Sequence, residues 1–334
     1  MRFTEPKRYH VHRRIARWTH RSPWIDRVLN GLEALFVPDG ELGALLDEVS
    51  PDVVILGSAG IKPQDVPLGR AARRRRLPLM GIVPSWDNLT SKGPLQARCD
   101  RLAVWCEQMR QEAVELCGYR ADEVVATGPP QFDPHFEPAT RDERARFFSR
   151  IGLDPGRKLI TYTSVPAGNC PFGTGFVDLL SGMLSREVVG WDCQLLVRLH
   201  PQDDFEAFEK LSPQPNVRIE RPGRYFGAAS GQTSILKYNP TDDDTRHLTQ
   251  TLRYSDVVIN IASTIALEAC LLDRPVVNIA FNLGEADRFI DLSEYYRTTH
   301  FRTITRSGAT RIVHSPGELR EAIRDGLAHP GRLS

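Results

Sequence analysis

The sequence of 334 residues lacks most of the short motifs that identify common enzyme classes. It contains neither G-x-G-x-x-G nor G-x-x-x-x-G-K-[ST], which argues against a dinucleotide-dependent dehydrogenase and a P-loop ATPase. H-E-x-x-H and G-x-S-x-G are also absent, which argues against a zinc protease and an α/β-hydrolase. The chemistry of this chain must therefore come from a less common arrangement of residues.

Long apolar runs and paired cysteines are missing as well. No stretch of about 18 apolar residues could span a bilayer, and the N-terminus has no apolar signal-peptide core. None of the six cysteines forms a C-x-x-C pair, which fits reduced thiols and no metal held by thiolates. A net charge of +1 gives no field that would select nucleic acid. We expect a cytoplasmic protein that binds no nucleic acid.

Positive charge is nevertheless concentrated in two places. The first 27 residues carry eight Arg and Lys residues, with Trp18 and Trp24 between them, against only Glu5 and Asp26. A second cluster comprises Arg70 and residues 73–76. Basic residues beside tryptophan suit peripheral association with an anionic membrane, at its inner face, or an acidic acceptor such as a lipid-linked polymer. Solvated helix faces explain the same residues equally well.

Apolar strands and amphipathic helices alternate along most of the chain. This alternation predicts an α/β protein with parallel sheets flanked by helices. Helices are expected at 40–48, 107–117, 141–150, 175–187 and 245–254, and Ser315 is expected to cap a last helix with Pro316 at its first position. The expected strands cover residues 52–57, 78–83, 101–105, 123–126, 158–163, 194–199, 216–220, 256–261 and 275–279.

Too many strands are expected for one small sheet, so we predict two doubly wound, Rossmann-like domains. The boundary lies within residues 127–138, where four prolines interrupt regular structure. We assign 1–135 to an N-terminal domain, whose first strand is not evident, and 136–334 to a C-terminal domain. Ligands of such folds bind at the carboxyl ends of the strands, here in a cleft that both domains face.

The segment 254–272 combines a buried strand, a polar turn and an apolar helix. Ser263 and Thr264 occupy the position of a helix N-cap. Glu268 interrupts a helix that is otherwise built for burial, and an unpaired buried carboxylate is costly. A phosphate at the helix N-terminus and a sugar hydroxyl at Glu268 would explain both features. An ordinary cap and a Glu at the edge of the sheet layer would also explain them.

The loop after the second expected strand, residues 83–93, is unusually polar. Asp87 could remove the proton of an acceptor hydroxyl, and Lys92 could hold a phosphate or carboxylate. The alternative is a turn in which Asp87 and Asn88 bond to the local backbone.

Two further loops follow strands of the second half. The strand at 194–199 ends in His200-Pro201, where proline terminates the ladder and presents the imidazole at the sheet edge. Such a histidine can donate to a phosphate oxygen and stabilise a leaving phosphate. In the loop 163–175, Ser164 could approach a phosphate closely. The acidic run 242–244 precedes an expected helix, so we interpret it as capping rather than as a metal site.

Together these loops resemble those of GT-B glycosyltransferases. The features that carry the resemblance are His200-Pro201, the Ser263-Thr264 turn with Glu268, the strand entry 273–277 and the linker 127–133. More narrowly, they are similar to bacterial sialyltransferases, Kdo transferases and CDP-glycerol glycerophosphotransferases that build surface polymers. The S-W-D-N-L-T-S-K-G loop at 85–93 also resembles one from bacterial surface-polysaccharide transferases.

This resemblance implies transfer of a sugar or polyol phosphate from a CMP-, CDP- or UDP-activated donor to a hydroxyl of a glycan or lipid-linked acceptor, without a cofactor or metal. His200 and Pro201, together with Ser164, Ser263 and Thr264, would bind the donor phosphate, and Glu268 its ribose. Asp87 would be the catalytic base, beside acceptor-binding Asn88, Ser91 and Lys92. Two alternatives remain open: a non-hydrolysing nucleotide-sugar 2-epimerase, and a catalytically silent GT-B-like binding protein.

Overall fold

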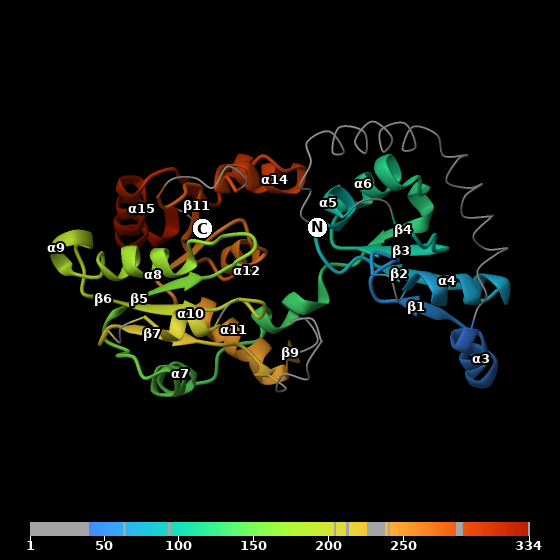
Figure 1. Ribbon diagram of the computed structural model, residues 1–334, viewed down its shortest axis with the longest axis horizontal. Coiled ribbons are helices and arrows are strands. Elements are labelled where there is room, and N and C mark those ends of the chain that lie inside the picture. The colour runs from blue at the N-terminus through green and yellow to red at the C-terminus, as the bar shows by residue number, and fades with distance from the viewer. Residues whose placement is uncertain are drawn as a thin grey trace. The chain divides into compact units, whose positions relative to one another are not determined.

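In the computed structural model the chain divides into two compact units, Met1–Pro129 and Pro130–Ser334. Residues 40–332 are described, apart from 63–64, 93–94, 204, 212–213, 226–237, 240 and 285–289. The basic, tryptophan-containing segment 1–27 lies outside the described residues. Both units contain parallel sheets flanked by helices (Figure 1), which confirms the expected α/β class with two Rossmann-like units.

The N-terminal unit contains one four-stranded parallel sheet in the order β1-β2-β3-β4. Its elements are α3 (Gly40–Val49), β1 (Val54–Leu56), α4 (Asp65–Arg74), β2 (Leu79–Ile82), α5 (Asn88–Ser91), β3 (Arg101–Val104), α6 (Glu107–Cys117), the 3₁₀ turn η1 (Ala121–Glu123) and β4 (Val124–Ala126).

Among residues 40–129, as far as they are described, the helices pack on one face of this small sheet. Successive parallel strands laid side by side in chain order place their right-handed crossover helices on the same face. Leu56, Leu79 and Leu102 are accordingly buried, whereas Ile55 and Val125 on the opposite face are each 53% exposed.

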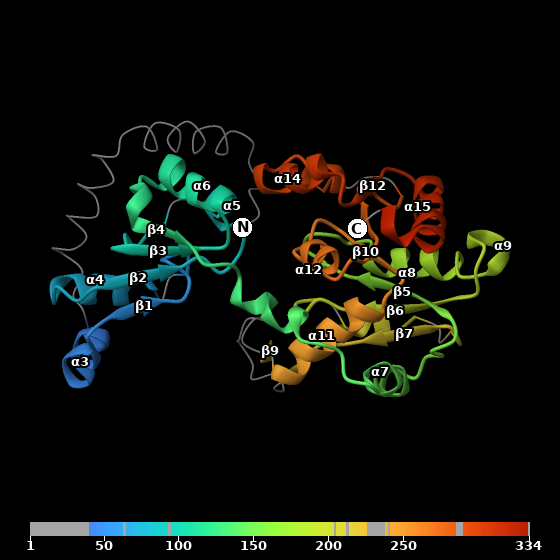
Figure 2. The same ribbon diagram turned by 180° about the vertical axis from the view of Figure 1, so that it is seen from behind.

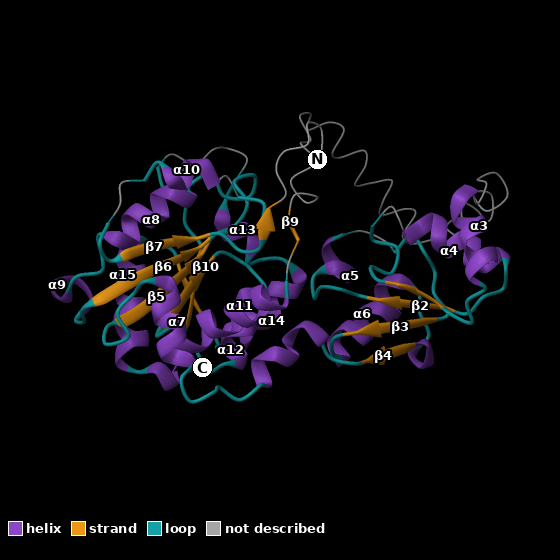
Figure 3. Ribbon diagram, turned by 90° about the horizontal axis from the view of Figure 1, so that it is seen from below, coloured by secondary structure: helices purple, strands orange, loops and turns teal. Residues whose placement is uncertain are grey.

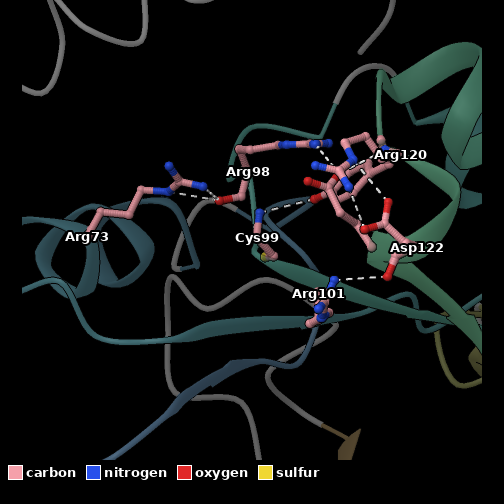
Figure 4. A network of polar contacts seen from close by, with 8 residues as sticks. Arg73, Arg98, Cys99, Arg101, Arg120 and Asp122 are labelled. Atoms are coloured by element: carbon pink, nitrogen blue, oxygen red, sulfur yellow. Dashed lines mark hydrogen bonds and ion pairs between the residues drawn. The ribbon is translucent and has the colours of Figure 1, made fainter.

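A polar network holds the loop that enters β3 (Figure 4). The Arg73 guanidinium donates to the backbone oxygen of Arg98. The Arg98 guanidinium stacks 3.6 Å from the centre of the Tyr119 ring, whose hydroxyl accepts from the Cys99 backbone N–H. Burial raises the pKa of the Tyr119 hydroxyl to about 12. Arg75 pairs with Asp47 at 2.6 Å, so at least part of the second basic cluster serves internal contacts.

The C-terminal unit contains a six-stranded parallel sheet in the order β12-β11-β10-β5-β6-β7 and a short antiparallel pair. Figures 2 and 3 label β5, β6, β7 and β10 of the larger sheet. Its strands are β5 (Lys158–Thr163), β6 (Cys193–Arg198), β7 (Val217–Glu220), β8 (Arg224–Tyr225), β9 (Tyr238–Asn239), β10 (Val257–Asn260), β11 (Val276–Ile279) and β12 (Arg311–Val313). Its helices are η2 (Pro130–Phe136, 3₁₀), α7 (Glu143–Ile151), α8 (Gly173–Ser181), α9 (Arg186–Val189), α10 (Phe205–Glu209), α11 (Asp242–Tyr254), α12 (Ile265–Leu271), α13 (Leu292–Tyr295), α14 (Thr299–Ser307), α15 (Pro316–Ala328) and η4 (Pro330–Arg332, 3₁₀).

Helices cover both faces of this larger sheet. The main apolar cluster packs α8 and α15 against one face of β5, β6, β10 and β11, while α7, α11 and α12 cover the other. Alternate residues of the central strands enter the two clusters, as the two-residue period of a strand requires. These strands are therefore buried on both sides, and only their ends can present polar groups.

Two expected helices differ in the structure. The predicted helix 175–187 is two helices, α8 and α9, separated at Gly182. Between them Leu184 is buried and its backbone oxygen accepts from Cys193 N–H, which no local pattern indicates. Helix α11 begins at Asp242 rather than at 245, because Thr241 caps it through a reciprocal bond with Asp244. The Ser315 cap with Pro316 at the first position is confirmed.

Candidate functional site

Ser164 and His200 meet at the carboxyl ends of two neighbouring strands. The last registered pair of β5 and β6 is Thr163 and Arg198. Ser164 directly follows Thr163, and His200 lies two residues beyond Arg198. The buried Ser164 hydroxyl accepts a hydrogen bond from the backbone N–H of His200 at 2.8 Å. The sheet thus places both residues at one edge, as the sequence predicted, and the serine fixes the backbone from which the imidazole projects.

The His200 ring has a defined tautomer. Its Nδ1 accepts from the backbone N–H of Gln202 at 3.1 Å, so in the neutral ring the proton is on Nε2. Burial lowers the pKa of this imidazole, because a partly desolvated site disfavours the charged form. Pro201 begins the turn, in which the Asp203 N–H donates a hydrogen bond to the His200 carbonyl. The result is a neutral imidazole with one N–H donor at the sheet edge.

The turn that follows β10 is held by backbone and side-chain bonds. The Asn260 side-chain oxygen accepts from Ser263 N–H, and the Ser263 hydroxyl accepts from Ile265 N–H, both at 3.3 Å. Thr264 occupies the N-cap position but its side chain makes no capping bond. Ser263 therefore performs the capping that the sequence attributed to the pair, and the Thr264 hydroxyl is uncommitted within the described chain.

Ala262 in this turn has a φ of 41°, a left-handed conformation that is costly for a residue with a Cβ. The Tyr296 hydroxyl holds it in place. That hydroxyl accepts from the Ala262 N–H at 3.0 Å and donates to the Ile279 carbonyl at 2.8 Å. Burial raises the pKa of this phenol far above its usual range. No motif or periodicity in the sequence marks Tyr296 as a residue that supports this turn.

Glu268 obtains its polar partner from within the chain. Its Oε2 lies 2.9 Å from Nε2 of His135, and the imidazole Nδ1 lies 3.0 Å from the Thr249 hydroxyl. The His135 side chain is 1% exposed and that of Glu268 is 12% exposed. The cost of a buried carboxylate did predict a partner, but His135 belongs to η2, 133 residues earlier, and its position could not be inferred.

The polar loop of the N-terminal unit is internally bonded. One Asp87 oxygen accepts from the Ser85 hydroxyl and the Asn88 amide, and the other accepts from the Ser91 hydroxyl at 2.6 Å. Lys92 Nζ lies 3.6 Å from that second oxygen. Asn88 in turn accepts from Ser85 N–H. The loop gathers the four predicted residues, and both oxygens of the Asp87 carboxylate accept hydrogen bonds within it.

Neither a metal cluster nor a membrane span emerges from the described ranges. Within them, no group of three or more His, Cys, Asp or Glu side chains has metal-binding geometry. No described helix is long and apolar enough to cross a membrane.

A surface cavity of about 300 Å³ lies between Trp191 and α15. Because Trp191 precedes β6, this cavity is at the opposite end of the strands from Ser164 and His200.

Comparisons with known proteins identify the fold. No protein-family model matches the sequence, and no curated protein matches it. The solved structures that resemble it include the UDP-GlcNAc 2-epimerase from Methanocaldococcus jannaschii, with 14% identity and a TM-score of 0.55 over 91% of this chain and 79% of that chain.

The UDP-GlcNAc 2-epimerase from Neisseria meningitidis, bound to UDP-GlcNAc, gives 14% identity and a TM-score of 0.57 over 88% of this chain and 74% of that chain. The S. aureus protein MnaA, solved with UDP, gives 13% identity and a TM-score of 0.54 over 89% and 72%. At these identities the likeness shows the two-domain GT-B architecture and nothing finer.

Proposed function

We propose that the C-terminal unit binds the nucleotide diphosphate of an activated sugar and that the protein acts on that sugar. The observation that carries this proposal is the neutral, Nε2-protonated His200 beside Ser164 at adjacent strand ends. Open parallel sheets bind ligands at this edge. Two similar folds were solved with UDP-GlcNAc or UDP, which favours a pyrimidine nucleotide.

His200 and Ser164 would bind the phosphate. The His200 Nε2–H can donate to a phosphate oxygen, and the Ser164 hydroxyl can donate while it accepts from His200 N–H. Pro201 limits the backbone freedom of the loop. Hydrogen bonds aimed at the leaving phosphate become stronger as negative charge develops on it, which is how they would accelerate its departure.

The turn after β10 and helix α12 would bind further phosphate oxygens and the ribose. Ser263 and the uncommitted Thr264 hydroxyl would contact phosphate oxygens, and Glu268 would accept from a ribose hydroxyl through Oε1. This oxygen makes no hydrogen bond to any described residue, whereas Oε2 is bonded to His135. A carboxylate with one fixed and one available oxygen is suited to hydroxyl recognition.

The reaction that these groups suit is transfer to a hydroxyl of a surface-glycan precursor. The bond between the sugar C1 and the donor phosphate oxygen breaks, and its electron pair leaves on the phosphate. The acceptor oxygen forms the new bond to C1, and its proton passes to a base, for which Asp87 is the candidate. Asn88, Ser91 and Lys92 would bind the acceptor. With a polyol phosphate, the same exchange takes place at phosphorus.

A second candidate is nucleotide-sugar 2-epimerisation. It is favoured by the similar folds that are UDP-GlcNAc 2-epimerases. Both reactions begin with departure of the same phosphate, so the donor site alone does not distinguish them. Epimerisation needs no acceptor, and this difference provides the test.

The first experiment measures thermal stability of the purified chain with CMP, CDP, UDP, GDP and ADP, since a ligand that binds the native state raises Tm. We expect a shift with one pyrimidine nucleotide that is lost in Glu268→Ala. The corresponding activated sugar is then followed by NMR. Product only with an acceptor indicates transfer, an epimer without acceptor indicates epimerisation, and binding without turnover indicates a silent binding protein. No shift with any nucleotide contradicts the proposal.

A further inference from the structure

His135 connects helix α11, which precedes β10, with helix α12, which follows it. Its Nε2 contacts Glu268 on α12, and its Nδ1 contacts Thr249 on α11. A neutral ring protonated on Nε2 satisfies both contacts, because it accepts from the Thr249 hydroxyl and donates to the carboxylate. The imidazole and the Thr249 residue are almost fully buried, so water cannot replace either bond.

The arrangement restricts the Glu268 side chain. A glutamate on a helix has several accessible rotamers, and holding one of them costs conformational entropy. The bond from His135 fixes Oε2 and leaves Oε1 as the oxygen without a partner among the described residues. The Phe132 ring, 5.8 Å from the imidazole centre, packs beside the ring and limits its rotation.

The same segment is anchored independently of the imidazole. The Arg253 guanidinium donates to the backbone oxygens of His135 and Glu137, at 3.3 and 2.6 Å. It also pairs with Glu143 at 2.9 Å. These contacts of Arg253 hold the backbone around His135 even when the imidazole is removed. Anchoring this segment therefore does not require a histidine that contacts Glu268.

We propose that His135 is a positioning residue for nucleotide recognition: it orients Glu268 so that Oε1 accepts a hydrogen bond from a ribose hydroxyl. This inference rests on the proposed nucleotide site, and it adds a residue from the linker to that site. Its consequence is specific. His135 governs the discrimination between ribose and deoxyribose rather than the affinity for the phosphates.

The test compares binding of the preferred nucleoside diphosphate with that of its 2′-deoxy and 3′-deoxy analogues by calorimetry. A charge-assisted hydrogen bond to the ribose predicts that wild-type protein favours the ribonucleotide about tenfold or more over one analogue. We expect His135→Leu to reduce this ratio to about twofold or less, with little change for the deoxy analogue.

Two variants distinguish positioning from a structural role. His135→Gln carries an amide N–H that can replace Nε2–H, and we expect it to restore most of the preference. Thr249→Val removes only the Nδ1 partner, and we expect an intermediate ratio. If His135→Leu fails to melt cooperatively, these two variants provide the test. The inference is overturned if Thr249→Val keeps the wild-type preference for the ribonucleotide while His135→Gln loses it.

An unchanged ratio in folded His135→Leu also overturns the inference while leaving the nucleotide site intact. Absence of any nucleotide binding to wild-type protein overturns the proposed function itself, and with it this role of His135. The two failures are therefore separate experimental results.

Discussion

The Tyr296 hydroxyl accepts a hydrogen bond from the backbone N–H of Ala262 at 3.0 Å and so fixes a turn 34 residues earlier in the chain. Ala262 has a left-handed φ of 41° and directly precedes Ser263 and Thr264. The phenol is only 6% exposed. Side-chain hydrogen bonding thus maintains a backbone conformation at the candidate phosphate turn that alanine does not favour by itself.

Removing this hydroxyl should loosen the turn. Tyr296→Phe leaves the Ala262 N–H and the Ile279 carbonyl without their partner, and we expect the free energy of unfolding to fall by about 1–3 kcal/mol. Nucleotide affinity should fall several-fold in the same variant. Tyr295→Phe is the matched control, because its hydroxyl bonds to the Asn169 carbonyl in an exposed position. Equal losses in both variants, measured by urea denaturation, would contradict this role of Tyr296.

Glycine should relieve strain at position 262. Ala262→Gly removes the Cβ that makes the left-handed region costly, and we expect a gain in unfolding free energy of up to about 1 kcal/mol. Ala266→Gly, in the first turn of α12 and fully buried, should instead lose about 1 kcal/mol or more. Thermal denaturation of both variants checks the contrast, and a destabilised Ala262→Gly would show that the turn is not strained.

Loss of the His200 imidazole should affect catalysis more than folding. We expect His200→Ala to reduce turnover by about 10²-fold or more while Tm changes little, because one donor to the leaving phosphate is lost. Steady-state kinetics with the identified activated sugar measures this. Turnover within threefold of wild type would remove His200 from the mechanism.

The lowered pKa of His200 also predicts a pH dependence of stability. In the native state the pKa is depressed by burial, so between that value and the unfolded value of about 6.5 the unfolded chain binds more protons. The contribution to stability is complete above pH 6.5 and is lost as pH falls through this window. Between pH 8 and pH 5, the Tm of wild type should therefore fall more than the Tm of His200→Asn. A constant difference would disprove the linkage.

Asp87 provides a test of the acceptor loop. We expect Asp87→Asn to lower transfer by about 10²-fold with donor affinity unchanged, since Asp87 belongs to the other unit and would act on the acceptor proton. Ser85→Ala removes one bond to the same carboxylate and keeps its charge. Kinetics should show that Ser85→Ala retains at least about a third of the activity. Equal losses in both variants would mean that Asp87 only shapes the loop.

Several features of the chain could be predicted without the structure. The β-branched and apolar run at 257–261 predicted an interior parallel strand, and proline at 201 predicted that β6 ends with His200 at the sheet edge. Ser315, Pro316 and Glu318 predicted the start of α15, with Ser315 accepting from Glu318 N–H. All of these depend on the few residues around each position, whose steric and hydrogen-bonding preferences act locally.

Long-range contacts decided the rest. The apolar surroundings of Glu268 required a partner, yet the choice of His135, which is itself bonded to Thr249, depended on how η2, α11 and α12 pack. The helix break at Gly182 arose because Leu184 enters the core and bonds to Cys193. The exposed face that carries Ile55 and Val125 followed from the order of strands in the sheet. Sequence periodicity fixes which side chains share a face, but only the three-dimensional packing decides what covers that face and which buried charge meets which partner.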